Sequence, residues 1–252
     1  MSRKVRILFI LDQFPGPTAG TEGQFWLLFQ GLDRERFDPA ILLLRSSPFL
    51  ETVAGDAPVR VLDVQRLRSP RSLWRVLKAV IWARRNKYDV AHIFFNDSSL
   101  VFPPLLRLAG IRVIVSRRDL GFWYTPGQLR ILRWNRRYVD WIVANCKAVR
   151  DAVCQAEHYD PSHVQVIYNG LVRHPPGLDR AATRHSLGIE AQAQVLAVVA
   201  NLRPLKRIDD AIRALSLVRQ RHPATMSIRS TFLWNVSGPT ARRYRLARRE
   251  RL

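Results

Sequence analysis

Two cations near the end of the sequence have types and a spacing that suit phosphate chemistry. Arg203 and Lys206 flank a proline in "ANLRPLKRID", which joins an apolar run to an amphipathic repeat. In such a strand-to-helix turn, both side chains would lie at the carboxyl end of the strand and could neutralise a diphosphate as a bond to it breaks. The alternative is a pair of solvated cations at a helix start, an arrangement that the helix dipole disfavours.

A glycine-rich segment follows the first apolar run of the chain. "GPTAGTEGQ", residues 16–24, separates "VRILFIL" from "FWLLFQGL" and contains the candidates Gly20, Thr21, Glu22 and Gly23. Glycines there let backbone N–H groups approach an anion, and the next helix adds a favourable dipole. The spacing is not that of a dinucleotide fingerprint. The segment therefore indicates either a loop that faces a ligand crevice or a flexible turn.

Apolar runs of strand length alternate with helical patterns up to about residue 170. The runs include "VRILFIL", "PAILLLR", "VRVLDV", "DVAHIFF", "RVIVS", "WIVAN" and "VQVIY", and one intervening helix is expected around Leu73, Leu77 and Ile81. Continuous apolar strands separated by helices are typical of a parallel sheet covered on both faces. We therefore predict an α/β fold with a Rossmann-like domain over residues 1–172.

A second, incomplete Rossmann-like domain is expected after the first. "VQVIYNGLVRHPPGLDR" ends in a Pro-rich polar stretch that predicts a linker over residues 173–194. Residues 195–222 have the pattern of one strand and one helix. Residues 223–252 form an Arg-rich tail with at most a short strand over 230–236, and we expect this tail to be poorly ordered.

The formal net charge of +21 over 252 residues predicts an anionic partner, which could be nucleic acid, an anionic membrane or a phosphorylated substrate. No nucleic-acid-binding module is recognisable, and the basic residues are scattered over helices. We therefore expect no specific nucleic acid, and a basic nucleic-acid-binding protein is the least favoured alternative.

A cationic and aromatic surface is expected on "LRILRWNRRYVDW", with "QRLRSPRSLWRVLK" and "WARRNK" upstream. One stripe holds apolar side chains and another holds arginines: Ile131, Trp134 and Tyr138 against Arg130, Arg133 and Arg137. Two interpretations stay open. The surface makes peripheral contact with an anionic membrane, or its apolar stripe packs on the sheet beneath solvated arginines.

The cysteines and the first apolar run indicate the cellular compartment of the protein. Cys146 and Cys154 fit buried reduced thiols, since no Cys-x-x-Cys pair or His cluster that could bind a metal accompanies them. The first run is short, meets Asp12 and lacks a cleavage pattern, so it predicts a buried strand instead of a signal peptide. No segment approaches the ~18 apolar residues of a membrane span. We expect a cytoplasmic protein, with a peripheral position on the inner face of the membrane as an additional option.

Six segments in order carry a resemblance to a known family. "AGTEGQ", "YDVAHIFF", "RVIVSRRDLG", "VDWIVANCKAVRD", "VQVIYNGL" and "VLAVVANLRPLKRIDDAIRAL" resemble the retaining glycosyltransferases of family 4, which have the two-domain GT-B fold. The match spans residues 5 to about 222. Each motif is loose alone, and the six in order are more specific.

The resemblance implies transfer of a sugar, with retention, from a nucleotide-sugar donor to a glycan or lipid-linked acceptor in cell-surface polysaccharide or glycolipid synthesis. In this family, residues that match Arg203 and Lys206 stabilise the leaving diphosphate, and the loop at residues 20–23 lies close to donor and acceptor. Asn169 and Gly170, the turn of "VQVIYNGL", are further candidates. The resemblance implies no metal, since the two cations do its work, and no cofactor, since the nucleotide sugar is a substrate.

Two positions depart from the family pattern. Many members carry a histidine at the end of one strand, where "VIVSRRDL" places Arg118 beside Arg117 and Asp119. This cationic pair could bind an anionic acceptor or the donor. His92 follows the family's first histidine but is expected in the middle of a strand, so a hydrogen-bonded structural role and a catalytic role both stay open.

A carboxylate motif of the family has no counterpart in the sequence. The Glu-x7-Glu pair holds the donor sugar and ribose in the family, whereas Glu190 precedes the expected strand and Glu250 lies in the Arg-rich tail. Loss of the family pattern, enrichment in Arg and an early stop together suggest a truncated or frameshifted gene. The alternative function is therefore a catalytically inactive fragment of such an enzyme.

Overall fold

The computed structural model describes residues 3–17, 20–47, 49, 57–67, 69–171, 179–186, 188–192, 194–198, 200, 204–221 and 226–230. The chain divides into two compact units, Met1–Val172 and Arg173–Leu252.

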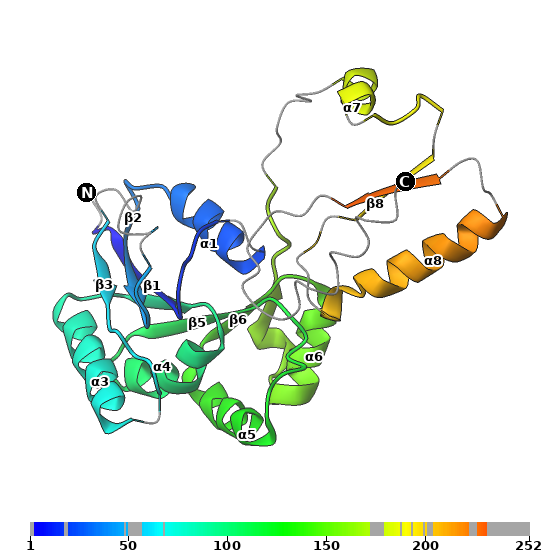
Figure 1. The fold of residues 1–252 in the computed structure, drawn as a ribbon. Coiled ribbons are helices and arrows are strands. Elements are labelled where there is room, and N and C mark those ends of the chain that lie inside the picture. Colours follow the sequence, from blue (N-terminus) through cyan, green and yellow to red (C-terminus); the bar gives the residue numbers. More distant parts are fainter. Residues whose placement is uncertain are drawn as a thin grey trace. The chain divides into compact units, whose positions relative to one another are not determined.

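The first unit is built on a seven-stranded sheet whose paired strands are all parallel (Figure 1). The order across the sheet is β3-β2-β1-β4-β5-β6-β7. The strands are β1 (Val5–Leu11), β2 (Phe37–Leu43), β3 (Val59–Val61), β4 (Val90–Ile93), β5 (Arg112–Arg117), β6 (Trp141–Ala144) and β7 (Val164–Val166). The predicted α/β fold with a parallel sheet is confirmed. Because the strands are parallel, their carboxyl ends share one edge.

Helices cover both faces of this sheet (Figure 1). They are α1 (Gly20–Gln30), α3 (Pro70–Arg85), α4 (Asn96–Leu108), α5 (Pro126–Asn135) and α6 (Lys147–Glu157), with the short 3-10 turns η1 (Arg136–Tyr138) and η2 (Pro161–His163). Successive residues of β1 face opposite ways: Phe9 belongs to the apolar cluster under α1, whereas Leu8 belongs to the cluster under α3, α4 and α6. This alternation is why an uninterrupted apolar run forms a strand buried on both faces.

Helix α4 contains two prolines, and a neighbouring side chain compensates for them. Pro103 and Pro104 have no N–H group, so the carbonyl groups of Ser99 and Leu100, four residues earlier, lose their helical donors. Nδ2 of Asn135, at the end of α5, donates to both carbonyl oxygens, at 2.9 and 3.0 Å. Asn135 is 2% exposed. Its amide therefore replaces the two missing hydrogen bonds inside the protein.

The described part of the second unit holds a short helix followed by a strand, a helix and a second strand. It comprises α7 (Arg180–Ser186), β8 (Gln194–Val198), η3 (Pro204–Lys206), α8 (Ile208–Arg221) and β9 (Met226–Ser230), and β8 pairs parallel with β9. Two details differ from expectation. Helix α7 lies inside the expected linker, where the carboxylate of Asp179 accepts from the N–H of Ala182 and caps its start. Strand β9 precedes the position expected for a short strand, and residues 231–252 lie outside the described residues.

Candidate active site

The strand order places a candidate site at the carboxyl edge of the sheet. β2 and β3 lie on one side of β1 and β4 to β7 on the other, so the direction of winding reverses between β1 and β4. In open α/β sheets, ligands bind outside the carboxyl ends of the strands at such a switch point. His92 in β4, Arg118 after β5 and Asn169 after β7 are all at or close to this edge.

Asp12, directly after β1, closes the amino end of α4. Its carboxylate accepts hydrogen bonds from the backbone N–H groups of Asp97 and Ser98, at 3.0 and 2.8 Å, and from the Ser98 hydroxyl at 2.6 Å. Phe95, which precedes the helix with φ 74°, makes no side-chain cap, so Asp12 supplies the cap from another strand. Burial raises the pKa of Asp12 to about 6, although the hydrogen bonds from Ser98 act in the opposite direction. The protein's own carboxylate thus occupies this helix end.

The predicted glycine loop is the first turn of a helix. Helix α1 begins at Gly20, so Gly20, Thr21, Glu22 and Gly23 have helical backbone. A Cβ atom at Gly23 would lie 2.9 Å from the carbonyl oxygen of Pro17. For residues 20–24 the loop prediction was wrong, because Gly23 serves a close approach between the preceding segment and the helix. The assignment of these four residues to donor and acceptor stays a prediction.

Arg118 is a partly buried cation that directly follows β5. Its guanidinium donates to Oδ1 of Asn169, and its carbonyl oxygen accepts from Nδ2 of Asn145 at 3.1 Å. Burial lowers the pKa of Arg118. Over the described residues, no carboxylate forms an ion pair with it. A guanidinium held in place without a carboxylate of its own is suited to bind an anion.

Arg117, by contrast, donates its hydrogen bonds to buried side chains of the protein. Its Nε and Nη2 donate to the two carboxylate oxygens of Glu157, at 2.7 and 2.9 Å, and its Nη1 donates to the Ser99 hydroxyl at 3.0 Å. The Arg117 and Glu157 side chains are 6% and 2% exposed. This two-point contact fixes the end of β5 to the end of α6 and so positions Arg118. The expected cationic pair is therefore one structural arginine and one arginine that can meet a ligand.

His92 lies within β4, as expected, between Phe9 of β1 and Ile114 of β5. Its Nε2 is 2.9 Å from the hydroxyl oxygen of Ser116, and its ring centroid is 4.4 Å from that of Phe94. Burial lowers the pKa of His92 to about 3, and Arg118 acts in the same direction. The imidazole is neutral at physiological pH and a weak base. These contacts favour the structural role over the catalytic one.

Asp119 shapes the loop after β5. Its Oδ1 accepts from the N–H of Gly121 at 2.8 Å. Gly121 has φ 68°, and a Cβ there would lie 2.7 Å from the Tyr124 ring, so the turn requires glycine. The Tyr124 hydroxyl donates to Oδ1 of Asn96 at 2.6 Å and anchors the loop to α4. Burial raises the pKa of Asp119, with the Gly121 contact acting against it. A catalytic role for Asp119 stays a prediction.

Gln24 of α1 joins the turn after β7 to the same edge. Its Nε2 donates to the carbonyl oxygen of Gly170, and the N–H of Gly170 donates to its Oε1, both at 2.8 Å. Asn169, in the same turn, accepts from Arg118. The structure therefore brings together α1, the end of β5 and the Asn169–Gly170 turn, three of the places that the sequence singled out.

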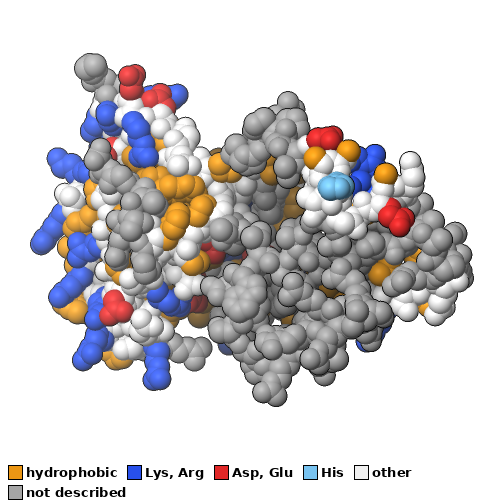
Figure 2. Space-filling model, turned by 45° about the horizontal axis from the view of Figure 1, so that its top comes forward, with side chains coloured by type: hydrophobic (Ala, Val, Ile, Leu, Met, Phe, Trp, Pro, Cys, Tyr) orange, Lys and Arg blue, Asp and Glu red, His pale blue; other side chains and the backbone are white. Residues whose placement is uncertain are grey.

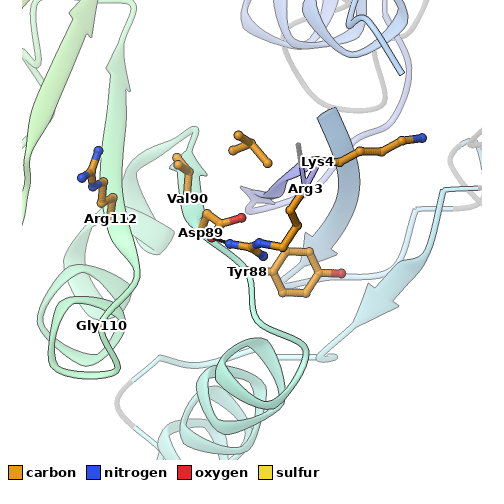
Figure 3. A pocket seen from close by; sticks show the side chains of 8 residues that line it. Arg3, Lys4, Tyr88, Asp89, Val90, Gly110 and Arg112 are labelled. Carbon is orange, nitrogen blue, oxygen red and sulfur yellow. Dashed lines mark hydrogen bonds and ion pairs between the residues drawn. The ribbon is translucent and has the colours of Figure 1, made fainter. Parts of the chain in front are cut away.

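A pocket lies at the opposite edge of the sheet, and none of the candidate site residues lines it. Its lining residues come from the amino ends of β1, β4 and β5 (Figure 3): Arg3, Lys4, Val5, Tyr88, Asp89, Val90, Gly110 and Arg112. Arg3 pairs with Asp89, whose carboxylate also accepts from the N–H of Arg6 at 2.8 Å. The Asp89 carboxylate is therefore already partnered, and amino edges of parallel sheets are not where ligands usually bind.

In the second unit, only one of the two predicted phosphate contacts lies in the described part. Lys206 ends η3, two residues before α8, and is exposed; Arg203 lies outside the described residues. Asp209 and Asp210 occupy the first turn of α8, where Asp210 pairs with Arg207. No partner is recorded for Lys206 within the described ranges. The diphosphate role of Arg203 and Lys206 stays a prediction.

Comparison with known proteins decides the family. A model of Glycosyltransferase Family 4 matches residues 19–172, which include α1, the carboxyl ends of β2 to β7 and the Asn169–Gly170 turn. The chain belongs to glycosyltransferase family 4. The expected resemblance is thereby confirmed.

Curated relatives match part of this chain. A D-inositol 3-phosphate glycosyltransferase from Mycolicibacterium gilvum is 33% identical over 160 residues, which are 58% of this chain and 36% of that protein. The match therefore spans about a third of the relative's length.

Solved structures show the fold of this family 4 chain. Anabaena HepE, in a complex with UDP and glucose, has a TM-score of 0.62 at 20% identity and covers 90% of this chain and 69% of its own. The lipopolysaccharide galactosyltransferase WaaB has a TM-score of 0.62 at 11% identity and covers 98% and 71%. At these identities the likeness establishes the fold, which is α/β of the GT-B type.

Several residues of this candidate site were not predicted. Asp12 and Gln24 were passed over, although an acid directly after the first buried strand and an amide in the "AGTEGQ" motif were visible signals. Phe122 and Trp123, which are 73% and 49% exposed in the loop after Arg118, were also missed. Over the described ranges, no group of His, Cys, Asp or Glu could hold a metal ion, and no helix is long and apolar enough to cross a membrane.

Proposed function

We propose that this chain acts in the transfer of a sugar, with retention, from a nucleotide-sugar donor to an acceptor of cell-surface polysaccharide or glycolipid synthesis. Family membership over residues 19–172 supports the class of reaction. A solved structure with the same fold, HepE, holds UDP and glucose. The observation that carries the proposal is the carboxyl edge of the sheet, where a partly buried Arg118 without a carboxylate is held beside a neutral His92.

The acceptor in this proposal carries an anionic group that pairs with Arg118. The geometric support is the fixed guanidinium, since its one recorded contact, with Oδ1 of Asn169, leaves donor N–H groups for a ligand. The named substrate of the relatives, inositol 3-phosphate, is an acceptor of that kind. Phe122 and Trp123, exposed in the adjoining loop, offer aromatic faces against which a sugar ring or lipid chain can pack.

The donor diphosphate in this proposal is met by Arg203 and Lys206 of the second unit. A cation at the carboxyl end of a strand can offset the charge that develops on a leaving diphosphate. The exposed Lys206, two residues before α8, supports this role. In this scheme the chain uses no cofactor, because the nucleotide sugar is itself consumed.

Calorimetric titration with UDP-glucose tests the donor side. The transferase proposal predicts saturable binding that weakens about tenfold or more in Lys206→Met, because a charge-assisted contact is lost. An inactive fragment would show no binding. Arg112→Met, an exposed cation at the amino end of β5, is the matched control and should bind like the wild type.

The location in this proposal is the cytoplasm, with peripheral contact to the inner face of an anionic membrane. The support is the formal net charge of +21 and the excess of Lys and Arg among the charged side chains drawn in Figure 2.

A further inference from the structure

Helix α3 turns apolar side chains outward as well as inward. Its inner face holds Ser72, Val76, Ala79, Val80 and Ala83, all buried. Its outer face holds Leu73, Trp74, Leu77 and Ile81, which are 49%, 54%, 36% and 41% exposed. The helix expected around Leu73, Leu77 and Ile81 is therefore present, but these three residues are not part of the core. An exposed cluster of large apolar residues on one helix requires an explanation.

A row of cations runs beside this apolar face. Arg71, Lys78 and Arg85 are seven residues apart, which is almost two helical turns, so they lie in one line along α3. All three are exposed, and the Lys78 ammonium lies 5.4 Å from the centre of the Trp74 ring. The sixteen residues of α3 include no Asp or Glu. The outer surface of α3 is thus apolar and cationic with no acidic side chain of its own.

In the expected basic surface on α5 and η1, two arginines are used structurally. Nε of Arg133 donates to the carbonyl oxygen of Ala156 at 2.8 Å, and Nη1 of Arg136 donates to that of His158 at 2.6 Å. Both carbonyl groups are at the carboxyl end of α6, where cations are favoured. Arg71, Lys78 and Arg85 have no such recorded contact among the described residues. These three cations of α3 therefore remain available for a partner.

We propose that the outer face of α3 docks on an anionic lipid bilayer. In an interfacial helix, apolar side chains enter the boundary between headgroups and acyl chains while flanking Lys and Arg side chains meet anionic headgroups. Leu73, Trp74, Leu77 and Ile81 supply the first set, and Arg71, Lys78 and Arg85 supply the second. This names the surface for the peripheral contact proposed above, and it does not depend on sugar transfer.

Flotation of the full chain with vesicles tests the proposal directly. One set of vesicles is made of phosphatidylcholine and phosphatidylglycerol in equal parts, and the other of phosphatidylcholine alone. The apolar variant is Leu73→Ser with Leu77→Ser, and its control is Leu108→Ser, which changes a leucine of α4 that is 76% exposed. The charge variant is Arg71→Ser, Lys78→Ser and Arg85→Ser. Its control removes the same charge from exposed positions elsewhere, through Lys4→Ser, Arg112→Ser and Lys147→Ser.

The wild type and both controls should bind the anionic vesicles. The apolar variant should bind about tenfold or more weakly, and the charge variant about a hundredfold more weakly, since each well-placed cation contributes roughly a factor of five. Equal binding by the charge variant and its control would overturn the proposal, because net charge alone would then explain adsorption. Equal binding to both kinds of vesicle would also overturn it. So would a wild type that sediments as a dimer, binds no vesicle and becomes monomeric in the apolar variant, since α3 would then contact a second copy.

Discussion

The side-chain amide of Gln24 and the backbone of Gly170 exchange two hydrogen bonds, one in each direction, both at 2.8 Å. The two residues are 146 positions apart in the sequence. Because Asn169 at the same turn accepts from Arg118, the pair connects α1 to the cation at the end of β5. The Gln24 amide thus holds the Asn169–Gly170 turn. Asn169 in that turn helps to hold Arg118, the proposed acceptor contact.

Replacing Gln24 with Ala should loosen this turn while leaving the fold intact. Both hydrogen bonds are exposed, so their loss should lower the free energy of unfolding by only about 1–2 kcal/mol. Hydrogen exchange should become faster at the Gly170 amide. Gln155→Ala, an exposed glutamine of helix α6, is the control. Unchanged exchange at Gly170 in Gln24→Ala would show that the contact does not hold the turn.

Asn135→Ala should destabilise the protein far more than its size suggests. The substitution leaves the carbonyl oxygens of Ser99 and Leu100 without donors, because the prolines of α4 cannot supply them. Each unsatisfied buried group costs about 1–3 kcal/mol, so we expect a loss of about 2–5 kcal/mol in denaturant unfolding. Asn86→Ala removes a single bond to the Trp82 carbonyl at a partly exposed site and serves as the comparison. Similar losses for the two variants would contradict this role of Asn135.

Asp12 should make stability depend on pH. Its folded-state pKa, raised by burial to about 6, lies above the ordinary value of 3.8, so the folded protein holds this proton more tightly than the unfolded chain does. The stabilising effect of the proton is complete below about pH 4 and is lost as the pH rises through about 6. Between these values, the wild type should lose up to about 3 kcal/mol relative to Asp12→Asn. The measurement is urea unfolding of both proteins across this range. Parallel pH profiles would show that the Asp12 carboxyl is not perturbed.

The strands were predictable because their signal is local. "VRILFIL" predicts a strand over the same seven residues that form β1, since a strand buried on both faces needs an uninterrupted apolar run. The position of Arg118 and Asn169 at one edge then follows from parallel strands alone. The glycines were misassigned, because Gly23 suits both a flexible loop and a helix that approaches Pro17 closely.

The remaining contacts depend on residues far apart in the sequence. Nothing near Asn135 indicates that it serves the prolines of α4, and nothing near Asp12 indicates that it caps that helix. The exposure of the outer apolar face of α3 could not be predicted for a different reason. Apolar residues occur on more than one side of this helix, so the pattern could not show which side meets the sheet.

The central claim, that the carboxyl edge of this sheet serves glycosyl transfer, is tested most directly by UDP release from UDP-glucose and UDP-galactose. The proteins to compare are the wild type, Arg118→Met, Lys206→Met and the control Arg112→Met, with D-inositol 3-phosphate or inositol as acceptor. The account predicts release by the wild type that the phosphorylated acceptor stimulates, loss of that stimulation in Arg118→Met, and a fall of about a hundredfold in Lys206→Met. Arg112→Met should match the wild type. Equal stimulation by both acceptors, or Arg118→Met and Arg112→Met behaving alike, would contradict it.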